Sequence, residues 1–276
     1  MHESLIMPAD PENLTEWARF LSNAEIPVLR KTMRSLTALR AQAATPGVRD
    51  VAVIIKQDPL MMTELLRYLQ QQKHQRQEHE VMQVEQALMM LGVENALDHI
   101  ATKPLVETVL HAHPSALVQL LHRVHRAHVA SNYALEWAIH LQDIHFEEIR
   151  TAALLHDITE LLLWCFSPAR MLALDTNLQD PAAHRRTAQE QVFGFALNDL
   201  QSRLVAEWSL PALLITLMDD ASSAQPRVRN VRLAVDLARH AAHGWDNEKL
   251  HGDLTAISEL LRTSVDEVKI MVGAPG

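Results

Sequence analysis

Apolar positions along this chain recur every three to four residues, which is the spacing of one face of an α-helix. In the segment DPLMMTELLRYL, Leu60, Leu65, Leu66 and Leu69 share one face and are expected to pack inward. No segment rich in Val, Ile, Thr and aromatic residues alternates at the period of two that a strand requires. The pattern therefore predicts an all-α protein. The predicted helices, with breaks inside some of them, cover residues 13–23, 28–42, 48–57, 59–73, 81–91, 93–111, 115–141, 146–166, 168–177, 184–207, 211–219, 227–242 and 253–271.

Prolines mark where several of these helices are expected to begin. Asp58-Pro59 places a capping side chain before a proline at the first helical position, and Asp180-Pro181 repeats this arrangement. Near the end of the chain, Ser264 and Glu267 have the spacing of a capping box. Four further helix starts are predicted at Pro104, Pro114, Pro168 and Pro211.

The segment His111-Ala-His-Pro114 is the predicted boundary between two helical units. Residues 1–112 would form an N-terminal bundle, and residues 113–276 a second bundle with a C-terminal helical extension. We expect a ligand or peptide to bind in a cleft between the two bundles.

The amino-acid composition of the chain argues against some classes of function. The chain has 276 residues, 48% of them hydrophobic, which is enough to bury the core of one large or two small domains. The net charge of −9 argues against a nucleic-acid partner. The arginines of PRVRNVRLAVDLARH (226–240) are interpreted as the solvated face of an amphipathic helix.

A cytoplasmic, reducing location is also predicted. A single cysteine, Cys165, excludes an internal disulfide, and its apolar neighbours indicate a buried structural thiol. The first residues contain no apolar leader segment, and no uncharged run is long enough to span a membrane. Two methionine pairs, Met61-Met62 and Met89-Met90, are expected in the core, although methionine can also line an adaptable binding groove.

One short segment, AALLHDITELLLW (152–164), places His156 and Asp157 side by side in an otherwise nearly apolar run. This segment and four others occur in an order that resembles the HDOD domain, the HD-related output domain of bacterial signalling proteins. The resemblance runs from about residue 20 to about residue 240. The four other segments are residues 26–29, 51–69, 84–97 and 206–211.

The resemblance implies a multi-helix fold in which an N-terminal bundle packs on an HD-like bundle, distantly related to HD phosphohydrolases. It also implies a non-catalytic signal-transduction module that acts through protein–protein interaction, with other signalling proteins as partners and no cofactor. Self-association of the chain stays open.

A metal site is the alternative that the same resemblance raises. HD phosphohydrolases hold a divalent metal through a distant His, the adjacent His-Asp pair and a later Asp, and the metal activates water to attack a phosphate ester. The matching candidates here are His125, His156, Asp157 and Asp236, the last placed to within one residue. With iron, manganese or zinc they would make a phosphohydrolase of a nucleotide or cyclic dinucleotide.

Departures from the family pattern favour the non-catalytic alternative. Thr159 replaces the glycine that commonly follows the pair, Leu197 stands near a position where metal-competent members carry a histidine, and residues 218–223 lack a His-His element. A buried His-Asp pair can instead tie two helices together. The sequence therefore predicts no catalytic residue.

Helical geometry adds two expectations. His125 lies at the edge of the apolar stripe of its helix, where it would face a shallow cleft or cap the core. On the predicted helix 146–166, His156 and Asp157 point about 100° apart. Glu160, four residues after His156, shares its face and could hydrogen-bond it.

Overall fold

The computed structural model describes residues 11–42, 46–72, 82–179, 184–222, 224–242 and 244–275. These residues form seventeen α-helices, one 3-10 helix and no strand, so the all-α prediction is confirmed. The helices are α1 (Leu14–Asn23), α2 (Arg30–Gln42), α3 (Val48–Ile55), α4 (Pro59–Gln72), α5 (Val84–Leu91), α6 (Val93–Ala101), α7 (Val106–Val109), α8 (Pro114–His140), α9 (Phe146–Leu155), α10 (Ile158–Phe166), α11 (Pro168–Asn177), α12 (Arg185–Phe193), α13 (Leu197–Glu207), α14 (Ala212–Leu217), η1 (Asp220–Ser222), α15 (Pro226–Ala241), α16 (Lys249–Leu261) and α17 (Val265–Val272).

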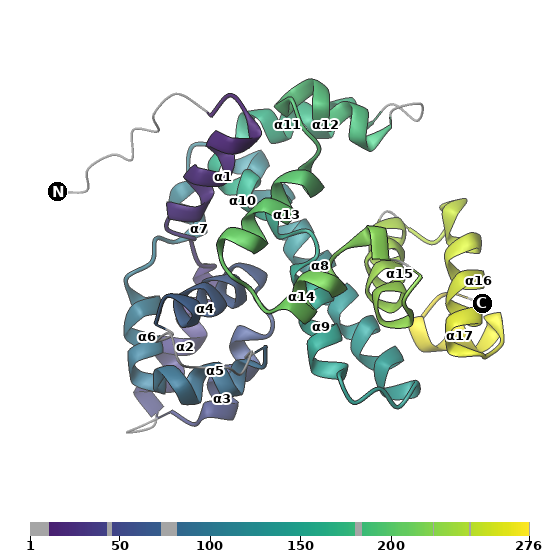
Figure 1. Cartoon of the computed structure of the whole chain (residues 1–276), viewed down its shortest axis with the longest axis horizontal. Helices are drawn as coiled ribbons and strands as arrows, with labels where there is room; N and C mark the ends of the chain where they lie inside the picture. Colours follow the sequence, from purple (N-terminus) through teal and green to yellow (C-terminus); the bar gives the residue numbers. More distant parts are fainter. Residues whose placement is uncertain are drawn as a thin grey trace.

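The long helix α8 runs through the middle of the molecule and packs against α9 and α15 (Figure 1). Helices α2 to α6 gather on one side of it, and α15 to α17 lie on the other (Figure 1). None of the described helices combines the length and the apolar character needed to cross a bilayer.

Several predicted helix ends are confirmed. The Asp58 carboxylate accepts hydrogen bonds from the backbone N–H groups of Leu60 and Met61, at 3.0 and 3.1 Å, and so caps α4. Pro114 and Pro168 are the first residues of α8 and α11, and the capping box at Ser264 begins α17.

The prediction for Pro104 is wrong. Its carbonyl accepts a hydrogen bond from the Val28 N–H at 2.9 Å, in a short extended contact between the chain before α2 and the chain before α7. Helix α7 begins only at Val106, because Pro104 is held by this contact. The second predicted cap, Asp180-Pro181, lies outside the described residues.

Long predicted helices are divided where the backbone turns. Gly92 (φ +79°) separates α5 from α6, at the predicted break between residues 91 and 93, and Gly194 (φ +84°) separates α12 from α13. The break between α9 and α10 falls at His156 and Asp157, where no glycine or proline signals it.

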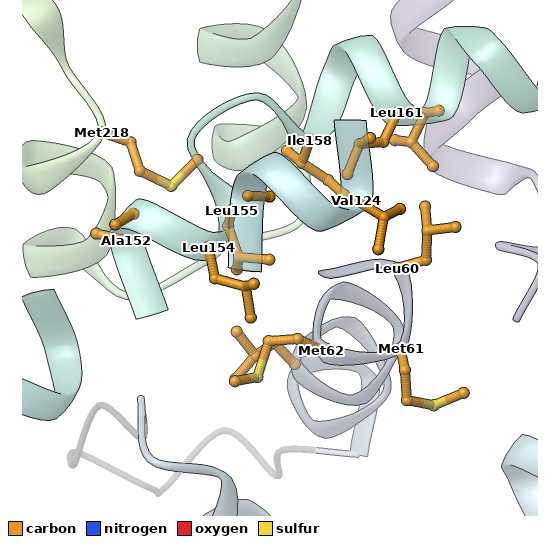
Figure 2. Packing of buried hydrophobic residues seen from close by; sticks show 14 of the residues in the cluster. Leu60, Met61, Met62, Val124, Ala152, Leu154, Leu155, Ile158, Leu161 and Met218 are labelled. Atoms are coloured by element: carbon orange, nitrogen blue, oxygen red, sulfur yellow. The ribbon is translucent and has the colours of Figure 1, made fainter. Parts of the chain in front are cut away.

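One hydrophobic core runs through both predicted bundles, from Trp17 to Val272. Figure 2 shows the junction: Leu60 and Met62 of α4 approach Val124 of α8 and Leu154 of α9. Apolar side chains therefore fill the interface between α4 and the central helices. A cleft between two separate bundles, as we predicted, requires this interface to be open, so that hypothesis is wrong.

The two methionine pairs differ in environment. Met61 and Met62 are buried, as predicted, but Met89 and Met90 are 64% and 41% exposed. Helix α5 buries the other face, formed by Val84, Ala87, Leu88 and Leu91, so the two methionines fall on its outer side. The prediction that Met89 and Met90 lie in the core is therefore wrong.

Candidate functional site

The His-Asp pair lies at the wall of a cavity of about 330 Å³, which is formed by α10, α12, α13, α15 and the break before α10. The break has an identifiable cause. The amide of Gln201, on α13, donates a hydrogen bond to the His156 carbonyl at 2.6 Å, and α10 then starts afresh from the Asp157 carbonyl. Because the two residues lie in a break, the predicted 100° separation along one continuous helix is wrong.

Asp157 is held by two arginines. Its Oδ2 lies 3.0 Å from Nη2 of Arg126 on α8 and 3.2 Å from Nη2 of Arg239 on α15, and Oδ1 lies 3.4 Å from the same nitrogen of Arg239. The Nδ1 atom of His156 is 3.1 Å from Oδ1. Burial raises the pKa of Asp157, but Arg239, the His156 hydrogen bond and Arg126 outweigh it, so the pKa lies well below its ordinary value.

Glu160, one helical turn further on, is held by three arginines. Arg123 Nε donates to Oε1 at 2.9 Å, Arg185 Nη2 donates to Oε2 at 2.6 Å, and Arg126 Nη2 lies 3.4 Å from Oε2. Burial raises the pKa of Glu160, yet the charges of Arg185, Arg126 and Arg123 lower it from 4.5 to about 2. Guanidinium groups thus contact both Glu160 oxygens. The prediction that Glu160 could hydrogen-bond His156 did not include these arginines.

Arg239 also links Asp236, the third acidic residue that lines the cavity, to this cluster. Its Nη1 donates to Oδ1 of Asp236 at 3.0 Å, three residues earlier on α15. Burial raises the pKa of Asp236, only partly offset by the charge of Arg239. Burial also lowers the pKa of Arg239, but Asp157 and Asp236 reverse this effect and keep the guanidinium charged.

The structure brings three of the four candidate metal ligands to one cavity. His156, Asp157 and Asp236 line it, whereas His125 lies on the exposed face of α8 and is not among the lining residues. The expectation that His125 faces a shallow cleft or caps the core is wrong, because its neighbours Val124, Arg126 and Ala127 take the buried positions.

These residues do not fit a divalent metal. Asp157 and Asp236 point carboxylate oxygens at guanidinium nitrogens, and a cation at those oxygens would have to displace Arg239 and Arg126. In the parts of the chain that the structure describes, no three His, Cys, Asp or Glu residues are grouped as a metal site would require. The cluster is an internal network of ion pairs.

Sequence reasoning missed the arginines of this network. The α15 arginines were expected on a solvated face, but none of Arg227, Arg229, Arg232 and Arg239 is fully exposed. Arg227 pairs with Asp143 at 2.6 Å and Arg229 with Glu259 at 2.7 Å. One signal was available: Arg232, Asp236 and Arg239 follow the i, i+4, i+7 spacing of a single helix face.

Solved structures share this architecture. The MmoQ response regulator from Methylococcus capsulatus is 15% identical, with a TM-score of 0.67 over 91% of this chain and 99% of that one. A virulence factor from Campylobacter jejuni is 16% identical, with a TM-score of 0.64 over 95% of this chain and 92% of that one. At these identities the similarity defines the fold alone, which is all-helical. No curated protein sequence matches this chain.

A family model described as the HDOD domain matches residues 26–223. The chain belongs to the HDOD domain family, and the resemblance found in the sequence is confirmed.

Proposed function

We propose that this chain is a non-catalytic signal-transduction module of HDOD type, which acts by binding other proteins and holds no catalytic metal. One observation carries the proposal: guanidinium groups of Arg126 and Arg239 contact both oxygens of the Asp157 carboxylate. A phosphohydrolase of the HD type needs that carboxylate as a metal ligand. An arginine pair instead makes it a structural element that joins α8, α10 and α15.

Two further observations support a signalling role. MmoQ, whose fold this chain shares, is described as a response regulator. The adjacent helices α3 and α5 carry exposed Val53, Met89 and Met90, and exposed apolar side chains of this kind are common where proteins meet.

The catalytic half of the proposal is tested with bis-p-nitrophenyl phosphate as substrate, in separate reactions with iron, manganese and zinc. The wild-type chain is compared with Asp157→Asn, which keeps the size of the side chain and removes its charge. We expect no turnover by the wild type above that of the variant. Metal-dependent hydrolysis by the wild type that Asp157→Asn lacks, with both proteins folded by circular dichroism, would show that the chain is a phosphohydrolase.

The interaction half is tested by affinity purification from the native host, followed by reconstitution. Each enriched protein is purified separately and titrated against the purified chain. We expect at least one to bind saturably at a defined stoichiometry. If no purified candidate binds, the proposed mode of action is wrong.

A further inference from the structure

Residues that line the cavity beside the His-Asp pair carry buried hydrogen-bond donors for which the described part of the chain provides no acceptor. Three buried donor atoms have no partner among the described residues: Nε of Arg232, Nε of Arg239 and Oγ1 of Thr159. All three residues line the same cavity. Buried polar groups in proteins are nearly always hydrogen-bonded. Three unused donors on residues that line one cavity would be explained by an acceptor bound beside them.

Arg232 is the most informative of the three. Other arginines of α15 each hold a carboxylate: Arg227 pairs with Asp143, Arg229 with Glu259, and Arg239 with Asp157 and Asp236. Within the described residues, Arg232 has no ion pair or hydrogen bond, although it is half-buried. A guanidinium group at such a position gains most from an oxyanion, which it can bind through two parallel hydrogen bonds.

The charge balance of the cavity favours an anion as well. Its acidic residues, Asp157, Glu160 and Asp236, are each held by arginines at 3.4 Å or less. Their negative charge is therefore compensated by Arg126, Arg185 and Arg239, and Arg232 adds a positive charge that nothing in the described residues balances.

The size of the cavity is also suitable. About 330 Å³ lies at the lower end of the range found for small-molecule sites. The cavity is thus large enough for a small metabolite, whereas a protein side chain inserted from a partner would fill only part of it.

We propose that this cavity binds a small molecule through an oxyanion group, either a phosphate or a carboxylate. Arg232 is the principal contact, and Nε of Arg239 and Oγ1 of Thr159 are additional donors. The inference rests on the proposed function in one respect, since the arginines must hold the carboxylates in place of a metal. Binding would give the signalling module a chemical cue.

Inorganic phosphate and citrate are the two probes for this site, each titrated into the full-length chain by calorimetry with ionic strength held constant by chloride. The variants are Arg232→Ala, Arg232→Gln, and Arg229→Ala as the matched control, since Arg229 lies one turn earlier on α15 and pairs with Glu259. We expect saturable binding to the wild type and the control, weakened about tenfold or more in both Arg232 variants. The probe that binds more tightly identifies the oxyanion as phosphate or carboxylate.

Two results would overturn the inference: no saturable binding of either probe, or binding that Arg232→Ala and Arg232→Gln leave unchanged. Circular dichroism establishes that the variants are folded, which is expected because Arg232 loses no contact with the residues that the structure describes. Binding that requires added divalent metal and is abolished by Asp157→Asn would contradict the proposed function too. Absence of binding without any metal dependence would remove only the oxyanion site.

Discussion

Replacement of Glu160 by glutamine is the sharpest test of the arginine network, because it removes one charge and keeps the shape of the side chain. Glu160 is buried and accepts hydrogen bonds from Arg123 and Arg185. Its pKa is lowered from 4.5 to about 2. A pKa shift of one unit corresponds to about 1.36 kcal/mol, so the ionised carboxylate stabilises the folded state by about 3 kcal/mol.

Two considerations set this magnitude. Arg185 is 39% exposed, so solvent screens part of its attraction to Glu160. The destabilisation by Glu160→Gln should therefore lie toward the lower end of the range measured for buried ion pairs. Removing one partner of a buried ion pair costs about 3–5 kcal/mol in other proteins, because the remaining charge is left without compensation. We therefore expect Glu160→Gln to lower the free energy of unfolding by about 3 kcal/mol at neutral pH.

The effect should also depend on pH in a defined direction. Since the pKa of Glu160 is lower in the folded than in the unfolded chain, its contribution is complete above about pH 4.5 and is lost as the pH falls toward about 2. Glutamine resembles the protonated carboxyl group. The difference in stability between wild type and Glu160→Gln should therefore shrink as the pH falls below about 4.5.

Urea denaturation at a series of pH values measures this difference. The matched control is Glu259→Gln. Glu259 is 63% exposed and, among the described residues, pairs only with Arg229, so its loss should cost less than about 1 kcal/mol. If Glu160→Gln is no more destabilising than the control, or if its effect does not diminish in acid, the carboxylate is not held by the arginines as described.

The remaining predictions concern the scaffold. Leu154→Ala, in the core between α4 and α9, should lower the free energy of unfolding by about 2–5 kcal/mol. Leu121 is 41% exposed on α8, so Leu121→Ala should cost less than about 1 kcal/mol. Urea denaturation measures both, and equal effects would contradict the packing in Figure 2. Ser264→Ala should cost about 1 kcal/mol through loss of the capping box of α17, and no change in thermal stability would contradict it. Met89→Gln with Met90→Gln should change stability by less than about 0.5 kcal/mol, whereas Met61→Ala should cost about 2–5 kcal/mol. A large effect of the exposed pair would mean that α5 buries the face that carries Met89 and Met90.

Signals that act locally in the chain predicted the helix ends well. Asp58 caps the helix that follows it, Gly92 supplies a positive φ between two helices, and Ser264 caps α17. In each case the cause lies within a few residues of its effect, so the sequence contains it.

The site depends on contacts that are distant in sequence, and for that reason it was predicted less well. The break at His156 and Asp157 is stabilised by Gln201, 45 residues later, and no local signal marks it. Arg126 and Arg239 reach Asp157 across 31 and 82 residues. In the sequence, these arginines look like the polar positions of two separate amphipathic helices. Only the packing of α8 and α15 on α10 turns them into partners of one carboxylate.

The proposed function requires that arginine guanidinium groups, and not a metal ion, hold the Asp157 carboxylate. The most direct test is the metal content of the chain by mass spectrometry, after purification without a chelator or a metal-affinity tag, beside Asp157→Asn. If the proposed function is right, neither protein contains stoichiometric iron, manganese or zinc, and the variant is less stable than the wild type. About one or two equivalents of metal in the wild type, absent from the variant, would contradict it and identify the pair as a metal site.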